Sequence, residues 1–118
     1  MPKRYTFFIH MKATKHWLSL SIEERGKFFQ EVIREIFERY PSVRSRLYDI
    51  NSFPTKCSDI AVHETENIDD FHSLREDIRK TKIFTVPYFE IVDIIPTVEE
   101  GFLESQFDKK KKLYYKYY

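Results

Sequence analysis

His10, Asp59 and His63 combine the side-chain types that acid/base chemistry uses. His10 lies in the alternating stretch YTFFIHMKA, and Asp59 and His63 lie in the alternating stretch DIAVHE. If these stretches are neighbouring strands, the two histidines approach each other on one face of a sheet. A histidine with a pKa near neutrality can deprotonate a bound substrate, and a carboxylate can orient its ring. The alternative is structural: the three groups line a polar interface and hydrogen-bond to one another.

The same groups have the atoms of a metal site but not its spacing. His10 and His63, with Asp59 or Glu64, would supply three nitrogen and oxygen ligands and leave a position open for zinc or iron. The chain has no H-E-x-x-H motif and no other compact ligand spacing. A single axial histidine could hold haem, but a lone histidine is poor evidence for it. We expect no metal and no cofactor.

A second polar group, Arg44, Arg46, Tyr48 and Glu90, is suited to ligand binding. Arg44 and Arg46 lie on the same side of one predicted strand, where two guanidinium groups could hold a carboxylate or a phosphate. The alternative is ion pairing across the sheet with Asp59 or Glu90. A further alternative is exposure on an edge strand, where charges oppose aggregation.

Cys57 is the single cysteine, so an intramolecular disulfide is excluded and a reducing compartment is the simplest expectation. As a nucleophile it would need a base or cation nearby to lower its thiol pKa. Lys56 adjoins it in sequence only. A small, partly buried side chain at the start of a strand is the more typical role.

Local patterns predict four strands, through alternation or apolar runs. The second and third are separated by only about six residues, which favours an antiparallel hairpin. The fourth is almost wholly apolar and ends at Pro96, which favours burial on both of its faces. The predicted strands span residues 5–13, 43–50, 57–65 and 88–95.

Two helices are predicted from their caps. Ser21 and Glu24 have the spacing of a capping box, in which each side chain bonds to the backbone N–H of the other. An apolar stripe follows as far as Pro41. Asn67 precedes the second helix and Asp70 lies in its first turn, where negative charge suits the helix dipole.

The order strand, helix, strand, strand, helix, strand predicts an α+β fold. It is the ferredoxin-like βαββαβ arrangement, a four-stranded antiparallel sheet with two helices on one face. We expect a single domain over residues 1–104 and a basic, aromatic tail over residues 105–118. The open face of the sheet is predicted to carry Phe8, His10, Lys12, Arg44, Arg46, Tyr48, Asp59, Ala61, His63, Glu90 and Val92.

Composition argues against several classes of function. Lys and Arg total 20 and Asp and Glu total 19, whereas most nucleic-acid binders are strongly basic. The tail has the residues to stack on single-stranded nucleic acid or to contact anionic lipid, but such short termini are more often solvated. Two glycines are too few for a phosphate-binding loop.

The first apolar run is short and contains His10 and Lys12, so we predict no signal peptide or membrane span and a soluble, cytoplasmic protein.

Four blocks of the chain, YTFFIHMKA, WLSLSIEER, CSDIAVHETEN and PYFEIVDIIP, resemble the darcynin family of small bacterial proteins. The resemblance extends over roughly residues 4–103. It implies an α+β domain of the dimeric α/β-barrel type and no particular reaction, so no catalytic residue is carried over. The residues at the family's motif positions are Trp17, Arg25, Cys57, Asp59, Tyr88 and Glu90.

The predicted open face leads to a functional hypothesis. Phe8, Tyr48, Ala61 and Val92 form a patch that is too apolar for water, and such patches mark interfaces or ligand grooves. We expect a homodimer that binds a small aromatic or anionic organic molecule on this face. Cofactor-free acid/base chemistry through a histidine would make it an enzyme. The alternative is a non-enzymatic interaction module whose sheet face is filled by its dimer partner.

Overall fold

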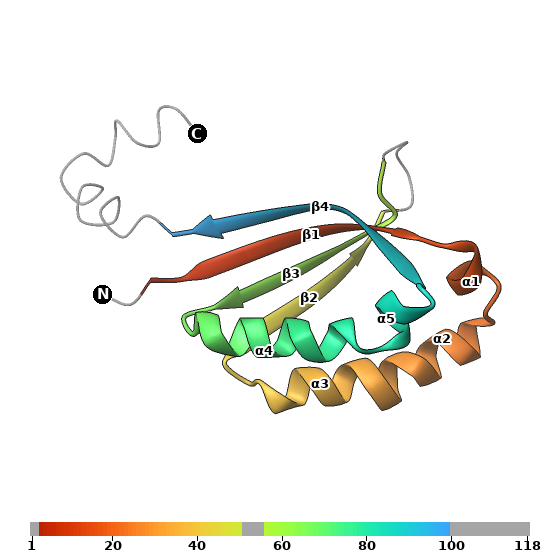
Figure 1. Ribbon diagram of the computed structural model, residues 1–118, viewed down its shortest axis with the longest axis horizontal. Coiled ribbons are helices and arrows are strands. Elements are labelled where there is room, and N and C mark those ends of the chain that lie inside the picture. Colours follow the sequence, from red (N-terminus) through yellow and green to blue (C-terminus); the bar gives the residue numbers. More distant parts are fainter. Residues whose placement is uncertain (1–2, 51–55, 100–118) are drawn as a thin grey trace.

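The computed structural model describes residues 3–50 and 56–99, and it has the predicted α+β, ferredoxin-like architecture (Figure 1). Four antiparallel strands form one sheet in the order β2-β3-β1-β4, and the helices cover one face of it (Figure 1). The predicted domain boundary and the tail lie outside the described residues. The elements are β1 (Tyr5–Ala13), α1 (Lys15–Leu18), α2 (Ile22–Phe28), η1 (Phe29–Ile33), α3 (Arg34–Arg39), β2 (Val43–Asp49), β3 (Asp59–Thr65), α4 (Ile68–Arg79), α5 (Lys82–Thr85) and β4 (Phe89–Val98).

Both predicted helix starts are confirmed by their hydrogen bonds. Ser21 Oγ accepts a bond from the Glu24 N–H at 3.1 Å, and Glu24 Oε1 accepts one from the Ser21 N–H at 3.0 Å. Asn67 Oδ1 accepts from the Asp70 N–H at 3.1 Å. The apolar stripe after Ser21 runs through α2, the π-helical turn η1 and α3, and it stops at Tyr40 as Pro41 predicts.

The single-turn helices α1 and α5 were not predicted, because four residues are too few to show a helical period. Each begins at a threonine cap: Thr14 Oγ1 accepts from the Trp17 N–H, and Thr81 Oγ1 accepts from the Ile83 N–H. The Thr14 hydroxyl also donates to the Pro87 carbonyl at 2.7 Å. Helix α1 is therefore held against the chain that enters β4.

Strand β4 is an edge strand, so the prediction that both of its faces are buried is wrong. Ile91 and Ile95 are 42% and 41% exposed. The strand also continues through Pro96 to Val98. Proline is tolerated on an edge strand because no neighbouring strand needs its missing N–H. An apolar run predicts a strand, but the crossover connections decide where in the sheet the strand lies.

The cross-strand register corrects the predicted face of β3. Phe7 pairs with His63, whereas His10 pairs with Ile60. Phe7 stacks on Phe71 of α4 with ring centroids 3.8 Å apart, so Phe7 and its cross-strand neighbour His63 face the helices. His10 faces the opposite, open side.

The predicted grouping of the two histidines on one face is therefore wrong. Asp59 and Ala61 lie on the helix side with His63, because residues two apart in a strand share a face. The open side of β3 instead carries Ile60, Val62 and Glu64, which pair with the open-side residues of β1. Alternation shows which residues share a face, but not which face the helices cover.

A register shift between His10 and Met11 adds one residue to β4. Met11 pairs with Ile91 and His10 pairs with Asp93, so Val92 is an extra residue in the ladder. The bulge brings Asp93 to the open face opposite His10, and the expected place of Val92 on that face stays a prediction. Before the bulge, Glu90 pairs with Lys12 and lies on the open face as predicted.

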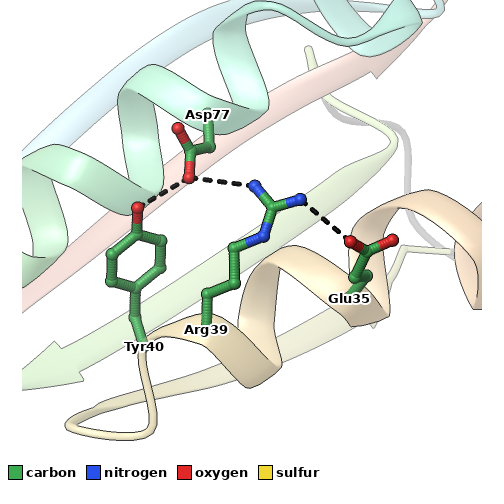
Figure 2. Close-up of polar contacts among 4 residues, drawn as sticks. All are labelled: Glu35, Arg39, Tyr40 and Asp77. Atoms are coloured by element: carbon green, nitrogen blue, oxygen red, sulfur yellow. Dashed lines mark hydrogen bonds and ion pairs between the residues drawn. The ribbon is translucent and has the colours of Figure 1, made fainter.

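Polar contacts tie α3 to α4 (Figure 2). The Tyr40 hydroxyl donates to Asp77 Oδ2 at 2.6 Å, and Arg39 reaches the same oxygen at 3.3 Å. Arg39 also donates to Glu35 on its own helix at 3.0 Å. The Tyr40 bond, followed by the Arg39 contact, lowers the pKa of Asp77, so the carboxylate form that accepts these bonds is favoured. The network fixes the spacing of two helices that face the sheet.

Candidate functional site

A cavity of about 490 Å³ lies between the sheet and the helix layer. It occupies space that a domain of this type would otherwise fill with core side chains, since protein interiors have few voids larger than a water molecule. The helices and the helix-facing side of the sheet both contribute apolar side chains to its wall. These are Ile9, Met11, Trp17, Phe28, Phe29, Ile33, Phe37, Leu47, Ala61, Phe71, Leu74, Ile78, Ile83, Phe84, Phe89, Ile91 and Ile94.

His63 is the most buried polar residue of the cavity wall. Its side chain is enclosed between the rings of Phe37 and Phe71, and the residue is 3% exposed. Its Nδ1 lies 2.7 Å from the hydroxyl oxygen of Ser45, the residue opposite it on β2. Burial lowers the pKa of His63 to about 4, so the ring is neutral at physiological pH. The predicted near-neutral pKa is therefore wrong for this histidine.

A carboxyl pair lines the cavity further along the same strands. Asp59 on β3 stands directly opposite Asp49 on β2. Four residues of strand separate Asp59 from His63, or roughly 13 Å. Burial raises the pKa of Asp59, and the neighbouring Asp49 carboxyl raises it further. The bond that Ser58 Oγ donates to Asp59 Oδ1, at 2.7 Å, and the charge of Arg25 both act in the opposite direction.

Trp17 forms an aromatic wall of the cavity with residues from α2 and the start of β4. Its ring centroid lies 5.0 Å from that of Phe89, 5.4 Å from Tyr88 and 6.3 Å from Phe28. The Arg25 guanidinium lies 5.7 Å from the centroid of the Trp17 ring, and its Nε donates to the Trp17 carbonyl at 3.2 Å. Trp17 and Asp59, two of the residues singled out by the family resemblance, therefore both line the cavity.

The predicted ligand-binding residues lie on the other side of the sheet. Arg46 and Tyr48 share a shallow depression with Glu64 on the open face, and Arg44 pairs with Glu64 across the ladder. Glu90 lies on the opposite edge strand, β4, with two strands between it and β2. Arg46 forms its ion pair with Glu64, at 3.4 Å, rather than with Asp59 or Glu90 as considered. Ligand binding by these four residues stays a prediction.

The structure also locates the single cysteine and bears on the metal and membrane expectations. Cys57 is half-buried just before β3. Within residues 3–50 and 56–99, no three His, Cys, Asp or Glu side chains are grouped so that they could hold a metal ion. The same residues include no helix with the length and apolar character needed to cross a membrane.

Comparison with known sequences tests the family resemblance. The profile of darcynin, a domain of unknown function, matches residues 2–110. The chain belongs to the darcynin family. Darcynin 1 of Acinetobacter baumannii is 46% identical over 89 residues, which cover 75% of this chain and 99% of the relative. A darcynin of Chromobacterium violaceum is 47% identical over 70 residues, covering 59% of this chain and 89% of the relative.

Solved structures extend the similarity of this darcynin-family protein to the chlorite dismutase fold. A chlorite dismutase from Candidatus Nitrospira defluvii in complex with imidazole has a TM-score of 0.73 at 21% identity, over 92% of this chain and 45% of that one. A mutant of the enzyme has a TM-score of 0.71 at 23% identity, over 88% and 44%. The chain therefore spans less than half the length of these structures. At this identity the likeness establishes the fold alone.

Sequence reasoning missed the cavity because its residues look like ordinary core. Phe28, Phe29 and Ile33 belong to the helical stripe, which predicts burial without showing whether the buried space is filled. Asp49 was predicted only as part of a strand. The available signal was the carboxylate on each side of the hairpin turn, Asp49 and Asp59, since residues that flank the turn between two paired strands lie opposite each other.

Proposed function

We propose that this darcynin-family protein binds a small, largely apolar organic molecule in the cavity between the sheet and the helices. The observation that carries the proposal is the cavity itself, about 490 Å³ with a predominantly apolar wall. Ligand sites typically have this size and this character, with a few polar groups that set orientation. Here His63 and the Asp49–Asp59 pair are those groups. The site therefore differs from the open-face site expected from the sequence.

The aromatic content of the wall favours a flat, aromatic ligand. Trp17, Phe28 and Phe89 lie at one end, and Phe37 and Phe71 flank His63. Aromatic rings prefer offset or edge-to-face contacts with other rings, which adds to the gain from burial. A bicyclic hydrocarbon such as isopropylnaphthalene is therefore a suitable probe of the cavity.

Binding can be followed through Trp17, the one tryptophan of the chain. Isopropylnaphthalene should change the Trp17 fluorescence saturably, at one molecule per protein chain. Ala61 faces the cavity and is 4% exposed. Replacing Ala61 with Leu should fill part of the space and weaken binding without destabilising the fold. In a filled core the same substitution would lower the free energy of unfolding by about 1–3 kcal/mol.

Ala13→Leu is the matched control, because Ala13 lies on the same side of the sheet but outside the cavity wall. It should leave probe binding unchanged. Absence of saturable binding by the wild-type protein would contradict the proposed function. Unchanged binding in Ala61→Leu would place any bound probe elsewhere.

We also propose that the open face packs against a second copy of the chain. Phe8, Val62 and Ile95 form an apolar strip there, in which Ile95 is 41% exposed and Val62 is buried within the protomer. Tyr48 on the same face is 49% exposed. Around the strip the ladder pairs opposite charges, Lys12 with Glu90 and Arg44 with Glu64. A face that carries both signs beside an apolar strip can complement itself about a two-fold axis. The cytoplasmic location expected from the sequence stays a prediction.

A further inference from the structure

The second ring nitrogen of His63 is oriented towards the cavity. In the described part of the chain, no fully buried side-chain nitrogen or oxygen lacks a hydrogen-bond partner. The hydrogen bond of His63 within these residues is made by Nδ1, with Ser45. Nε2 therefore keeps some accessible surface. Because the residue is 3% exposed and lines the cavity, that surface belongs to the cavity.

The bond to Ser45 bears on which ring nitrogen of His63 carries the proton. A neutral imidazole has one N–H donor and one acceptor nitrogen. Within the described residues, His63 is the partner of the Ser45 hydroxyl. If this hydroxyl donates to Nδ1, its one proton is used and the ring proton is on Nε2. Ser45 does not line the cavity, so it acts on a ligand through His63 rather than as a nucleophile.

We propose that the cavity selects uncharged aromatic carbonyl compounds, such as aryl ketones or quinones, whose oxygen accepts a hydrogen bond from the Nε2–H of His63. This inference rests on the proposed cavity function and names its ligand class. A donor without charge, enclosed by Phe37 and Phe71, suits a neutral acceptor better than an anion, because burying an unpaired anion there is costly. The carboxyl pair at the other end of the cavity also disfavours an anion.

The competing ligand class is an aromatic carboxylate held at the cavity rim. Arg75 and Arg79 of α4 both line the cavity. Arg79 already contacts Glu76 at 3.1 Å, which leaves Arg75 as the better candidate for an anion. Both arginines are exposed, so their attraction for a carboxylate is weakened by solvent and salt. We therefore expect a carboxylate to gain less binding energy at the rim than a carbonyl gains from the enclosed His63 donor.

The test compares three probes of similar shape: isopropylnaphthalene, acetylnaphthalene and naphthoate. Acetylnaphthalene should bind about three- to tenfold more tightly than isopropylnaphthalene, the range expected for one buried hydrogen bond. His63→Phe should remove this preference, so that the ketone and the hydrocarbon bind with equal affinity. His63→Gln retains an N–H donor, so it should keep part of the preference for the ketone that His63→Phe loses. It also provides the test if the Phe variant does not fold.

Ser45→Ala tests the positioning role of the serine. Nitrogen NMR of the wild-type protein should show that the His63 ring carries its proton on Nε2. The His63 signal is assigned as the one that is absent from the spectrum of His63→Gln. Ser45→Ala should redistribute the proton between the two nitrogens and reduce the preference for the ketone. A serine with a purely structural role would leave the tautomer unchanged.

The outcomes separate the two proposals. Equal affinity for the ketone and the hydrocarbon would overturn the ligand class and leave the cavity function standing. Tighter binding of naphthoate would also overturn the ligand class, in favour of an anion at Arg75. A proton on Nδ1 in the wild-type protein would overturn the donor role of His63. Failure of all three probes to bind would overturn the cavity function and the ligand class together.

Discussion

At the scale of single residues, the environment of His63 couples stability to pH. Its pKa falls from an ordinary 6.5 to about 4 because the ring is buried. The unfolded chain therefore takes up a proton at a higher pH than the folded chain does. Between these two values the unfolded state binds more protons, so the free energy of unfolding decreases as the pH falls. The gap between 6.5 and about 4 corresponds to about 3 kcal/mol, at 1.36 kcal/mol for each pH unit.

We expect urea denaturation of the wild-type protein to show this decrease as the pH is lowered from 6.5 towards 4. His63→Gln should flatten the pH dependence, because its side chain does not titrate. His72→Gln is the control, since His72 is exposed on α4. It should retain the wild-type slope. A slope that survives in His63→Gln would show that other groups cause it.

For Asp59 we predict the opposite pH dependence, a free energy of unfolding that decreases as the pH rises. Its pKa is raised, first by burial and then by Asp49, so the carboxylate form is disfavoured in the folded state. The stability that this group contributes is present at low pH and is lost as the pH rises through its folded pKa. Asp59→Asn should therefore stabilise the protein at neutral pH. The gain should be at most about 1 kcal/mol, because the group is partly exposed to solvent.

The Tm of Asp59→Asn should exceed that of the wild type at pH 7 and approach it below pH 3.8, where the carboxyl is protonated. The amide of this variant keeps an oxygen that can accept the Ser58 bond, so the comparison isolates the charge. Asp93→Asn on the exposed part of β4 should have a smaller effect. A lower Tm for Asp59→Asn at neutral pH would mean that the carboxylate is stabilising.

At the scale of elements, the first long helix consists of α2, η1 and α3 in continuous succession. The π-helical turn η1 lies at the cavity, with Phe29 and Ile33 on its wall. Such wide turns often occur at functional sites. In α2, Gly26 has no atom within 4 Å of the position where a Cβ would lie, and it is exposed. A glycine here costs backbone entropy without serving a close contact.

Gly26→Ala should stabilise the protein by about 0.5–1 kcal/mol, because alanine loses less backbone entropy when the helix forms. Urea denaturation measures the change. Ser21→Ala in the same helix should act in the other direction, by about 1 kcal/mol, because it removes the N-cap oxygen that accepts from Glu24. A neutral or destabilising Gly26→Ala would indicate that the glycine has a role beyond this helix.

At the scale of the whole molecule, the apolar strip on the open face, which is exposed at Ile95, predicts a dimer. Ile95→Asp places a charge in that strip and should convert the dimer to a monomer, as measured by sedimentation or light scattering. Ile22→Asp is the control, because Ile22 is 84% exposed at the start of α2, in the layer on the other side of the sheet (Figure 1). It should leave the dimer intact. A monomeric wild-type protein at micromolar concentration would rule out the proposed assembly.

The amino-acid sequence by itself determined the element order and the fold class. The capping box at Ser21, the cap at Asn67 and the alternation in β1 are local signals, because they depend on hydrogen bonds and side-chain spacing within a few residues. The order of the elements then restricts the topology, since crossover connections have a preferred hand. These signals were sufficient for the sheet and its helix layer.

Only the tertiary structure decided which face of β3 meets the helices. Both faces of that strand carry apolar and polar side chains, so alternation cannot distinguish them, and the pairing of His63 with Phe7 decides the question. The cavity and the low pKa of His63 follow from this placement. They depend on how side chains from separate strands and helices fill one space, and no local pattern records whether that space is full.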